Sequence, residues 1–216
     1  MVGIHGIEAL ALDVDGDIFE QNGGFVIRVD RSSPKGRRRF TIAHEIGHAL
    51  LFPVAGVPRG SSACGRSAEL ERLCDIAATE FIMPAAQVGQ YFARREASIE
   101  NIVGMARDFD VSFHAAALRM VELLPWCSGI AALVCDSDAG DPTISWTAGC
   151  SGDVLRGYGM LHLVQEAIET GSKQFSEMII GAGGQARKCV VEAAPLAGPG
   201  RMLLLIRRGT INRSRP

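Results

Sequence analysis

The chain lacks the sequence features of several large protein classes. It has no apolar run long enough to span a bilayer, which excludes a helical membrane protein. Its six cysteines are scattered without C-x-x-C pairs, so neither a disulfide framework nor a structural zinc knot is expected. A formal net charge of −2 gives no overall attraction to nucleic acid or to a membrane. Residues 1–12 contain Glu8 and no basic leader, so we expect no secretory signal and predict a cytoplasmic protein.

One short motif, His44-Glu45-Ile46-Gly47-His48, carries the most specific chemistry in the chain. Residues i and i+4 share one face of a helix, so His44 and His48 can both reach a single ion. Glu45 follows the first histidine, where its carboxylate can take a proton from an activated water. A Zn²⁺ ion with an open position lowers the pKa of such a water to about 7 and polarises a carbonyl. The motif therefore predicts a metal-dependent peptidase.

The motif lies within a pattern typical of an amphipathic helix. Residues 39–51 contain apolar side chains at helical spacing, namely Phe40, Ala43, Ile46, Gly47, Leu50 and Leu51, and Pro53 follows. The alternative without a metal site is two core or surface histidines beside a solvated glutamate. The full spacing inside a helical pattern favours the metal site.

A zinc site needs a third protein ligand. A third histidine soon after the motif is excluded, because Leu51 and Val54 occupy the corresponding positions. A carboxylate from the next predicted helix, residues 67–83, is the other solution; its apolar stripe comprises Leu70, Leu73, Cys74, Ala77 and Phe81. Glu71 and Asp75 lie four residues apart on one side of this helix, so one can bind metal while the other orients a histidine. Either one taken alone can equally be a solvated carboxylate.

Two segments together resemble the ImmA/IrrE family of metallopeptidases. The first is Arg39-Phe40-Thr41-Ile42-Ala43 with the motif, and the second is Glu71-Arg72-Leu73-Cys74-Asp75 with the run that ends in Met83-Pro84. The family pattern is R-F-T-x-A-H-E-x-G-H, then E-x-x-C/A-D/N and small or apolar residues up to M-P. Two motifs in the right order are more specific than either motif alone.

The resemblance implies a zincin-like peptidase domain with assigned roles. Glu71 occupies the family's position for the third metal ligand, Asp75 the neighbouring supporting position, and Glu45 that of the general base. It also implies a site-specific protease that cuts a helix-turn-helix repressor in a stress or mobile-element response. Family members generally carry a helix before the first strands, which is missing or very short here. Zn²⁺ is the expected ion, although a site of two histidines and a carboxylate also accepts Mn²⁺ or Fe²⁺.

The rest of the chain predicts an α+β protein of two domains. The peptidase domain, residues 1–124, is expected to hold strands at residues 7–14 and 24–29, with turns at 15–17 and 22–24. It ends in a helix-turn-helix-like pair at residues 97–124, started by Ser98 and broken at residues 110–112. Residues 125–216 read as five strands and one helix, at residues 160–170, in a small antiparallel-sheet domain. The element order is similar to that of a GAF domain, which implies a small ligand or partner.

Two other functions stay open. One is a non-proteolytic regulator that binds metal, which the presence of Glu45 disfavours. The other is a DNA-binding regulator that uses residues 97–124, although the second helix offers only Arg119 and His114 and no basic cluster, so a scaffold is preferred. Basic residues at 35–39 and at Arg207, Arg208, Arg213 and Arg215 are read as solvated segments rather than nucleic-acid sites. Candidates for stabilising an oxyanion are Tyr91, Tyr158 and His162.

Overall fold

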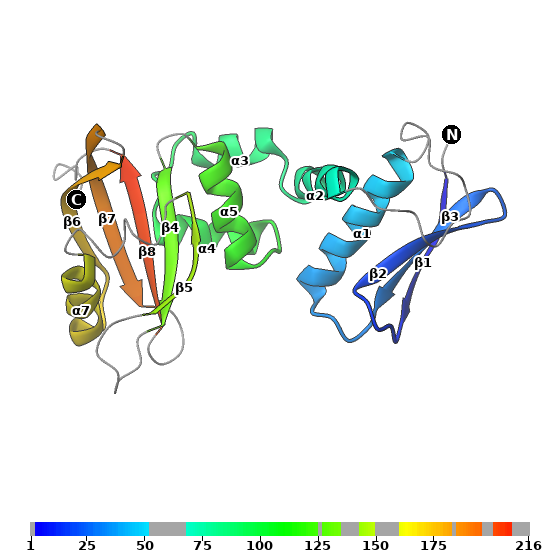
Figure 1. Cartoon of the computed structure of the whole chain (residues 1–216), viewed down its shortest axis with the longest axis horizontal. Helices are drawn as coiled ribbons and strands as arrows, with labels where there is room; N and C mark the ends of the chain where they lie inside the picture. Colours follow the sequence, from blue (N-terminus) through cyan, green and yellow to red (C-terminus); the bar gives the residue numbers. More distant parts are fainter. Residues whose placement is uncertain are drawn as a thin grey trace. The chain divides into compact units, whose positions relative to one another are not determined.

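A computed structural model describes most of the chain as helices and strands around two small sheets (Figure 1). The described residues are 3–51, 68–124, 127–134, 143–149, 160–182, 185–195 and 201–208. They form two compact units, Met1–Gln87 and Val88–Pro216. The predicted α+β class is confirmed, and the domain boundary after residue 124 stays a prediction.

The first unit begins with a three-stranded sheet of β1 (Ile4–Leu10), β2 (Gly16–Gln21) and β3 (Gly24–Asp30). The central strand β3 pairs in parallel with β1 and antiparallel with β2. Asn22 and Gly23 connect β2 to β3 with φ values of 52° and 79°. Both values are positive, as a two-residue hairpin turn of this kind requires.

The predicted strand at residues 7–14 is wrong in its bounds, and the predicted turn at residues 15–17 contains the start of β2. Two long-range contacts explain the extra strand. A Cβ on Gly16 would lie 2.5 Å from Thr41 Cγ2, so this strand approaches the following helix too closely for a side chain. Asp17 forms an ion pair with Arg28 on the neighbouring β3. Neither contact is visible in the local sequence, where Asp and Gly indicate a turn.

Two helices complete the first unit, α1 (Lys35–Leu51) and α2 (Ala68–Ile82). Helix α1 packs against β2 and β3 on one side and against α2 on another. The predicted motif helix is therefore confirmed. The predicted helix end at Pro53 and the predicted start at Ser67 lie outside the described residues.

The predicted apolar stripe of α2 is wrong in part. Only Cys74 and Ala78 of this helix are buried, whereas the side chains of Leu73 and Phe81 are 39% and 50% exposed. Small residues face α1 because they let the two helix backbones approach closely. The larger apolar residues consequently lie on the other faces of α2.

Three described helices precede the second sheet: α3 (Ala85–Phe92), which contains the boundary between the two units, α4 (Ile99–Asp108) and α5 (Phe113–Leu123). Helix α3 was not expected from the sequence. The other two were, with Ser98 at the start of α4 and a break at residues 110–112 before α5. Ser98 Oγ accepts a hydrogen bond from Asn101 N at 3.1 Å, and Ser112 Oγ accepts one from Ala115 N at 3.1 Å. Both serines are helix N-caps.

Helix α5 is a packing element of this unit. It lies against β4 (Cys127–Val134) and β5 (Thr143–Ala148), and the His114 ring centroid is 4.4 Å from that of Trp146. Arg119 is buried, only 4% exposed, and forms an ion pair with Glu122 at 3.0 Å. A buried arginine cannot reach a DNA groove, which supports the scaffold interpretation of the helix pair.

The second sheet has five antiparallel strands in the order β5-β4-β8-β7-β6. Its last three strands along the chain are β6 (Gln174–Ala182), β7 (Gln185–Pro195) and β8 (Arg201–Arg208). Helix α7 (Met160–Thr170) precedes β6. Helix α7 covers one face, where its apolar side chains pack on Cys189, Val191 and Leu204. The five strands and the helix that the described residues of this part form confirm the predicted element order, and the GAF likeness stays a prediction. Among the described residues no helix is long and apolar enough to cross a membrane.

Candidate metal centre

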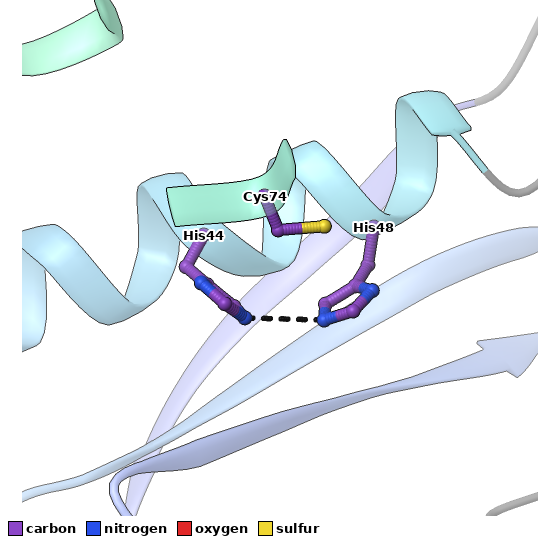
Figure 2. Close-up of side chains that lie close together, drawn as sticks. All are labelled: His44, His48 and Cys74. Atoms are coloured by element: carbon purple, nitrogen blue, oxygen red, sulfur yellow. Dashed lines mark hydrogen bonds between the residues drawn. The ribbon is translucent and has the colours of Figure 1, made fainter. Parts of the chain in front are cut away.

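The two motif histidines lie on one side of α1 with their rings converging. His44 Nε2 and His48 Nε2 are 3.1 Å apart (Figure 2). Zn–N bonds of about 2.0–2.1 Å in a tetrahedral site place two ligand atoms about 3.3 Å apart. Positions i and i+4 of the helix thus hold the two Nε2 atoms at about the separation that binding to one ion requires.

The Glu71 side chain extends from α2 toward the two histidine Nε2 atoms. Its Oε2 lies 3.2 Å from His44 Nε2, and its Oε1 lies 3.5 Å from His48 Nε2. Two imidazole nitrogens and a carboxylate therefore converge at the separations of a tetrahedral ion. Both donor types suit a divalent cation such as Zn²⁺ or Mn²⁺, so the residues present fit a metal.

Asp75, one helical turn after Glu71, contacts the other nitrogen of the first histidine. His44 Nδ1 lies 2.8 Å from Asp75 Oδ1, a hydrogen-bond distance. When Nδ1–H donates to this carboxylate, the Nε2 lone pair points toward the ion position. An outer carboxylate commonly fixes a metal-binding histidine in this way.

Glu45 occupies the buried face of α1, and its side chain is only 3% exposed. It follows His44 directly, while His48 lies at the same helix face and is 5% exposed. A carboxylate on the residue after the first histidine, held away from bulk water, is suited to proton transfer. The structure thus places each predicted residue of the centre on α1 or α2 of the first unit.

A close crossing of α1 and α2 sets the position of Glu71. A Cβ on Gly47 would lie 3.2 Å from Cys74 Cα and 3.4 Å from Cys74 Cβ and O. Any side chain at position 47 would crowd the α2 backbone one turn after Glu71. The glycine of the motif therefore permits the helix contact that carries the third predicted ligand.

Cys74 belongs to this neighbourhood in a way that the sequence analysis missed. Its Sγ and one ligand atom each of His44 and His48 all lie within 4.8 Å of one another, and Figure 2 shows its side chain entering from α2. The prediction for Cys74 was core packing, and it is indeed fully buried. The available signal was its position three residues after Glu71, which puts both side chains on one helix face.

The three candidates for oxyanion stabilisation stay predictions. Tyr91 and His162 belong to the second unit, and Tyr158 lies outside the described residues. Arg95 stacks over the Tyr91 ring at 4.2 Å, and the Tyr91 hydroxyl would lie 2.6 Å from a Cβ on Gly104. The group that stabilises an oxyanion therefore stays unassigned.

The basic run at the start of α1 is partly engaged in local contacts. Arg37 forms an ion pair with Asp15, which lowers the pKa of that carboxyl below its ordinary range and raises the pKa of Arg37. Arg38 donates to the backbone oxygen of Arg31 at 2.8 Å. Arg207 lies 3.3 Å from Glu96, while Arg213 and Arg215 lie outside the described residues. These contacts favour structural roles for Arg37, Arg38 and Arg207.

Comparison with known proteins gives three findings. Residues 4–121 match the Peptidase_M78 family, described as the IrrE N-terminal-like domain. The chain is 27% identical over 104 residues to the radiation response metalloprotease IrrE of Deinococcus radiodurans. That match covers 46% of this chain and 32% of the relative, so the chain spans about a third of the relative's length. A solved Mycobacterium tuberculosis transcriptional regulator has a TM-score of 0.52 at 15% identity, covering 95% of this chain and 66% of that one, which shows a shared fold alone.

Proposed function

The chain belongs to the Peptidase_M78 family of IrrE N-terminal-like domains, and on that premise we propose that it is a metal-dependent endopeptidase. His44, His48 and Glu71 would hold the ion. The observation that carries the proposal is the convergence of their Nε2 and carboxylate oxygen atoms at 3.1–3.5 Å. Zn²⁺ is the proposed ion, with Mn²⁺ as the second choice, because both accept this donor set.

The protein's own residues account for the proton transfers. A divalent ion bound at this centre would acidify a water and polarise the scissile carbonyl. Glu45 removes a proton from the attacking water and later delivers it to the leaving amine. The pairing of Asp75 with His44 Nδ1 holds the ring so that Nε2 keeps its lone pair free. Burial of Glu45 limits competition from solvent for that proton.

We propose a regulatory substrate rather than bulk protein. Family membership supports this, as does the relative whose name describes a radiation response metalloprotease. The proposed target is a helix-turn-helix transcriptional repressor, cut at one site in a stress or mobile-element response. A small ligand or partner bound at the second sheet is a proposed means of control. The buried Arg119 argues against sequence reading by α5 as the main activity.

The experiment compares new protein N-termini in cells that express the wild-type chain or the Glu45→Gln variant. Both proteins should contain the ion, because the substitution removes only the proton acceptor. Glu69→Gln is the matched control, since Glu69 is an exposed glutamate on α2. We expect a small set of cleavage products with the wild type and the control, and none with Glu45→Gln. Identical products with all three proteins would contradict the proposed mechanism.

A further inference from the structure

Cys74 lies beside the proposed metal ligands although neither the motif nor the mechanism requires a thiol. Its Sγ and a ligand atom of each motif histidine lie within 4.8 Å of one another. Cys74 follows Glu71 by three residues on α2, so the two side chains share the helix face toward α1. It forms no disulfide and is fully buried, with no exposed surface.

We propose that Cys74 is a fourth donor to the ion, an inference that rests on the proposed metal centre. Zn–S bonds of about 2.3 Å and Zn–N bonds of about 2.0–2.1 Å place sulfur about 3.6 Å from each nitrogen in a tetrahedral site. In the structure the three atoms are spread over up to 4.8 Å, so coordination requires the thiol to approach the histidine nitrogens. Coordination releases the thiol proton to solvent and leaves a thiolate on the ion.

The fourth donor changes what the centre can do. Two histidines and Glu71 leave a position open for water and substrate, whereas four protein ligands complete a tetrahedral shell. With Cys74 bound, the centre retains its ion but offers no position for hydrolysis. The thiol thus acts as a restraint on the peptidase, released when Sγ withdraws from the ion.

The same donor sets a preference among metals. Thiolates favour soft or borderline ions such as Zn²⁺, while Mn²⁺ prefers oxygen and nitrogen donors. Removal of the Cys74 thiol should therefore weaken Zn²⁺ binding and leave Mn²⁺ binding nearly unchanged. A residue that merely fills space between α1 and α2 would affect both ions equally.

The test uses Co²⁺ as a spectroscopic replacement for Zn²⁺ in the full chain. Cobalt bound to a thiolate shows an intense near-ultraviolet charge-transfer band, whereas its visible bands report binding by any ligand set. We compare the wild type with Cys74→Ala and Cys74→Ser. Cys189→Ala is the matched control, because Cys189 is also buried and forms no disulfide, but packs in the core of the second sheet.

We expect the charge-transfer band in the wild type and in Cys189→Ala, and its loss in both Cys74 variants while the visible bands persist. Zn²⁺ affinity should fall by at least about tenfold in Cys74→Ala, the smallest effect usual even for an outer partner of a metal ligand. Visible cobalt bands without the charge-transfer band in the wild type would overturn this inference alone. A wild-type chain that binds no cobalt would overturn the proposed function as well. If Cys74→Ala does not fold, Cys74→Ser gives the same comparison.

Discussion

Replacement of Gly47 by alanine tests whether the helix crossing positions the third ligand. The added methyl group would lie 3.2 Å from Cys74 Cα, a contact with backbone that must shift by a few tenths of an ångström. Alanine normally stabilises a helix interior by about 1 kcal/mol relative to glycine. Overpacking of a tight contact costs about 1–3 kcal/mol. We therefore expect Gly47→Ala to be neutral to destabilising by about 2 kcal/mol, against the usual trend.

The effect on metal binding should be larger than the effect on folding. Outward movement of α2 carries Glu71 away from the histidines, and the ion can draw it back only by restoring the crowded contact. The part of the overpacking cost that this movement relieves in the metal-free protein, up to about 3 kcal/mol, then appears as a loss of up to roughly 150-fold in affinity. Calorimetric titration with Zn²⁺ and thermal unfolding measure the two quantities.

Gly36→Ala is the matched control for this prediction. Gly36 lies in the same helix, and a Cβ there would meet nothing within 4 Å. We expect this variant to bind metal with wild-type affinity and to unfold at or above the wild-type temperature. Wild-type affinity together with raised stability in Gly47→Ala would refute the reasoning about the crossing.

Three further predictions follow from particular side chains. Glu45→Gln should keep its metal, measured by elemental analysis, and lose about 10²- to 10⁴-fold in cleavage rate; an unchanged rate would exclude Glu45 as the base. Asp75→Asn should lower metal affinity by about 10- to 100-fold because the amide fixes His44 less well, and equal affinities would exclude the supporting role. Burial raises the pKa of Glu192 above its ordinary 4.5, so the folded state binds this proton more tightly than the unfolded state. Its contribution to stability is full below that ordinary value and is lost as pH rises through the raised pKa. In urea unfolding, the wild type should therefore lose stability relative to Glu192→Gln as pH rises from about 4.5 to neutrality. The same difference at both ends of this range would contradict the assignment.

Local patterns were sufficient for much of the fold. The motif helix, the Ser98 cap of α4, the break before α5 and the strands around α7 follow from helical spacing, capping chemistry and runs of β-forming residues. Gly171, with a φ of 59°, follows the end of α7 as a glycine cap does. These features depend on neighbours only a few residues apart, and such neighbours are visible in a single sequence.

Features that depend on distant partners were missed. The start of β2 resembles a turn, and only the approach to Thr41 and the pairing of Asp17 with Arg28 show why it is a strand. Helix α3 was missed because Pro84 was taken only as an end, although proline also precedes helix starts. Ala85 N donates to Glu80 Oε1 at 2.9 Å across this junction.

The candidate metal centre likewise combines features that local sequence predicts with features that depend on distant partners. The i and i+4 positions of His44 and His48 predicted their convergence, since helix geometry alone determines it. The residues alone left Glu71 and Asp75 as alternative third ligands, and the family resemblance selected Glu71, because the angle between α1 and α2 is a tertiary property. The place of Cys74 beside the histidines depends on that same angle, and on the absence of a side chain at Gly47.

Metal content per chain, measured beside Glu71→Gln, tests the central claim most directly. Glu69→Gln serves as the control, because it changes an exposed glutamate two residues away on the same helix. We expect about one Zn²⁺ or Mn²⁺ per wild-type and control chain and a large loss of metal in Glu71→Gln. Full metal content in Glu71→Gln, or no metal in the wild type after reconstitution, would contradict it.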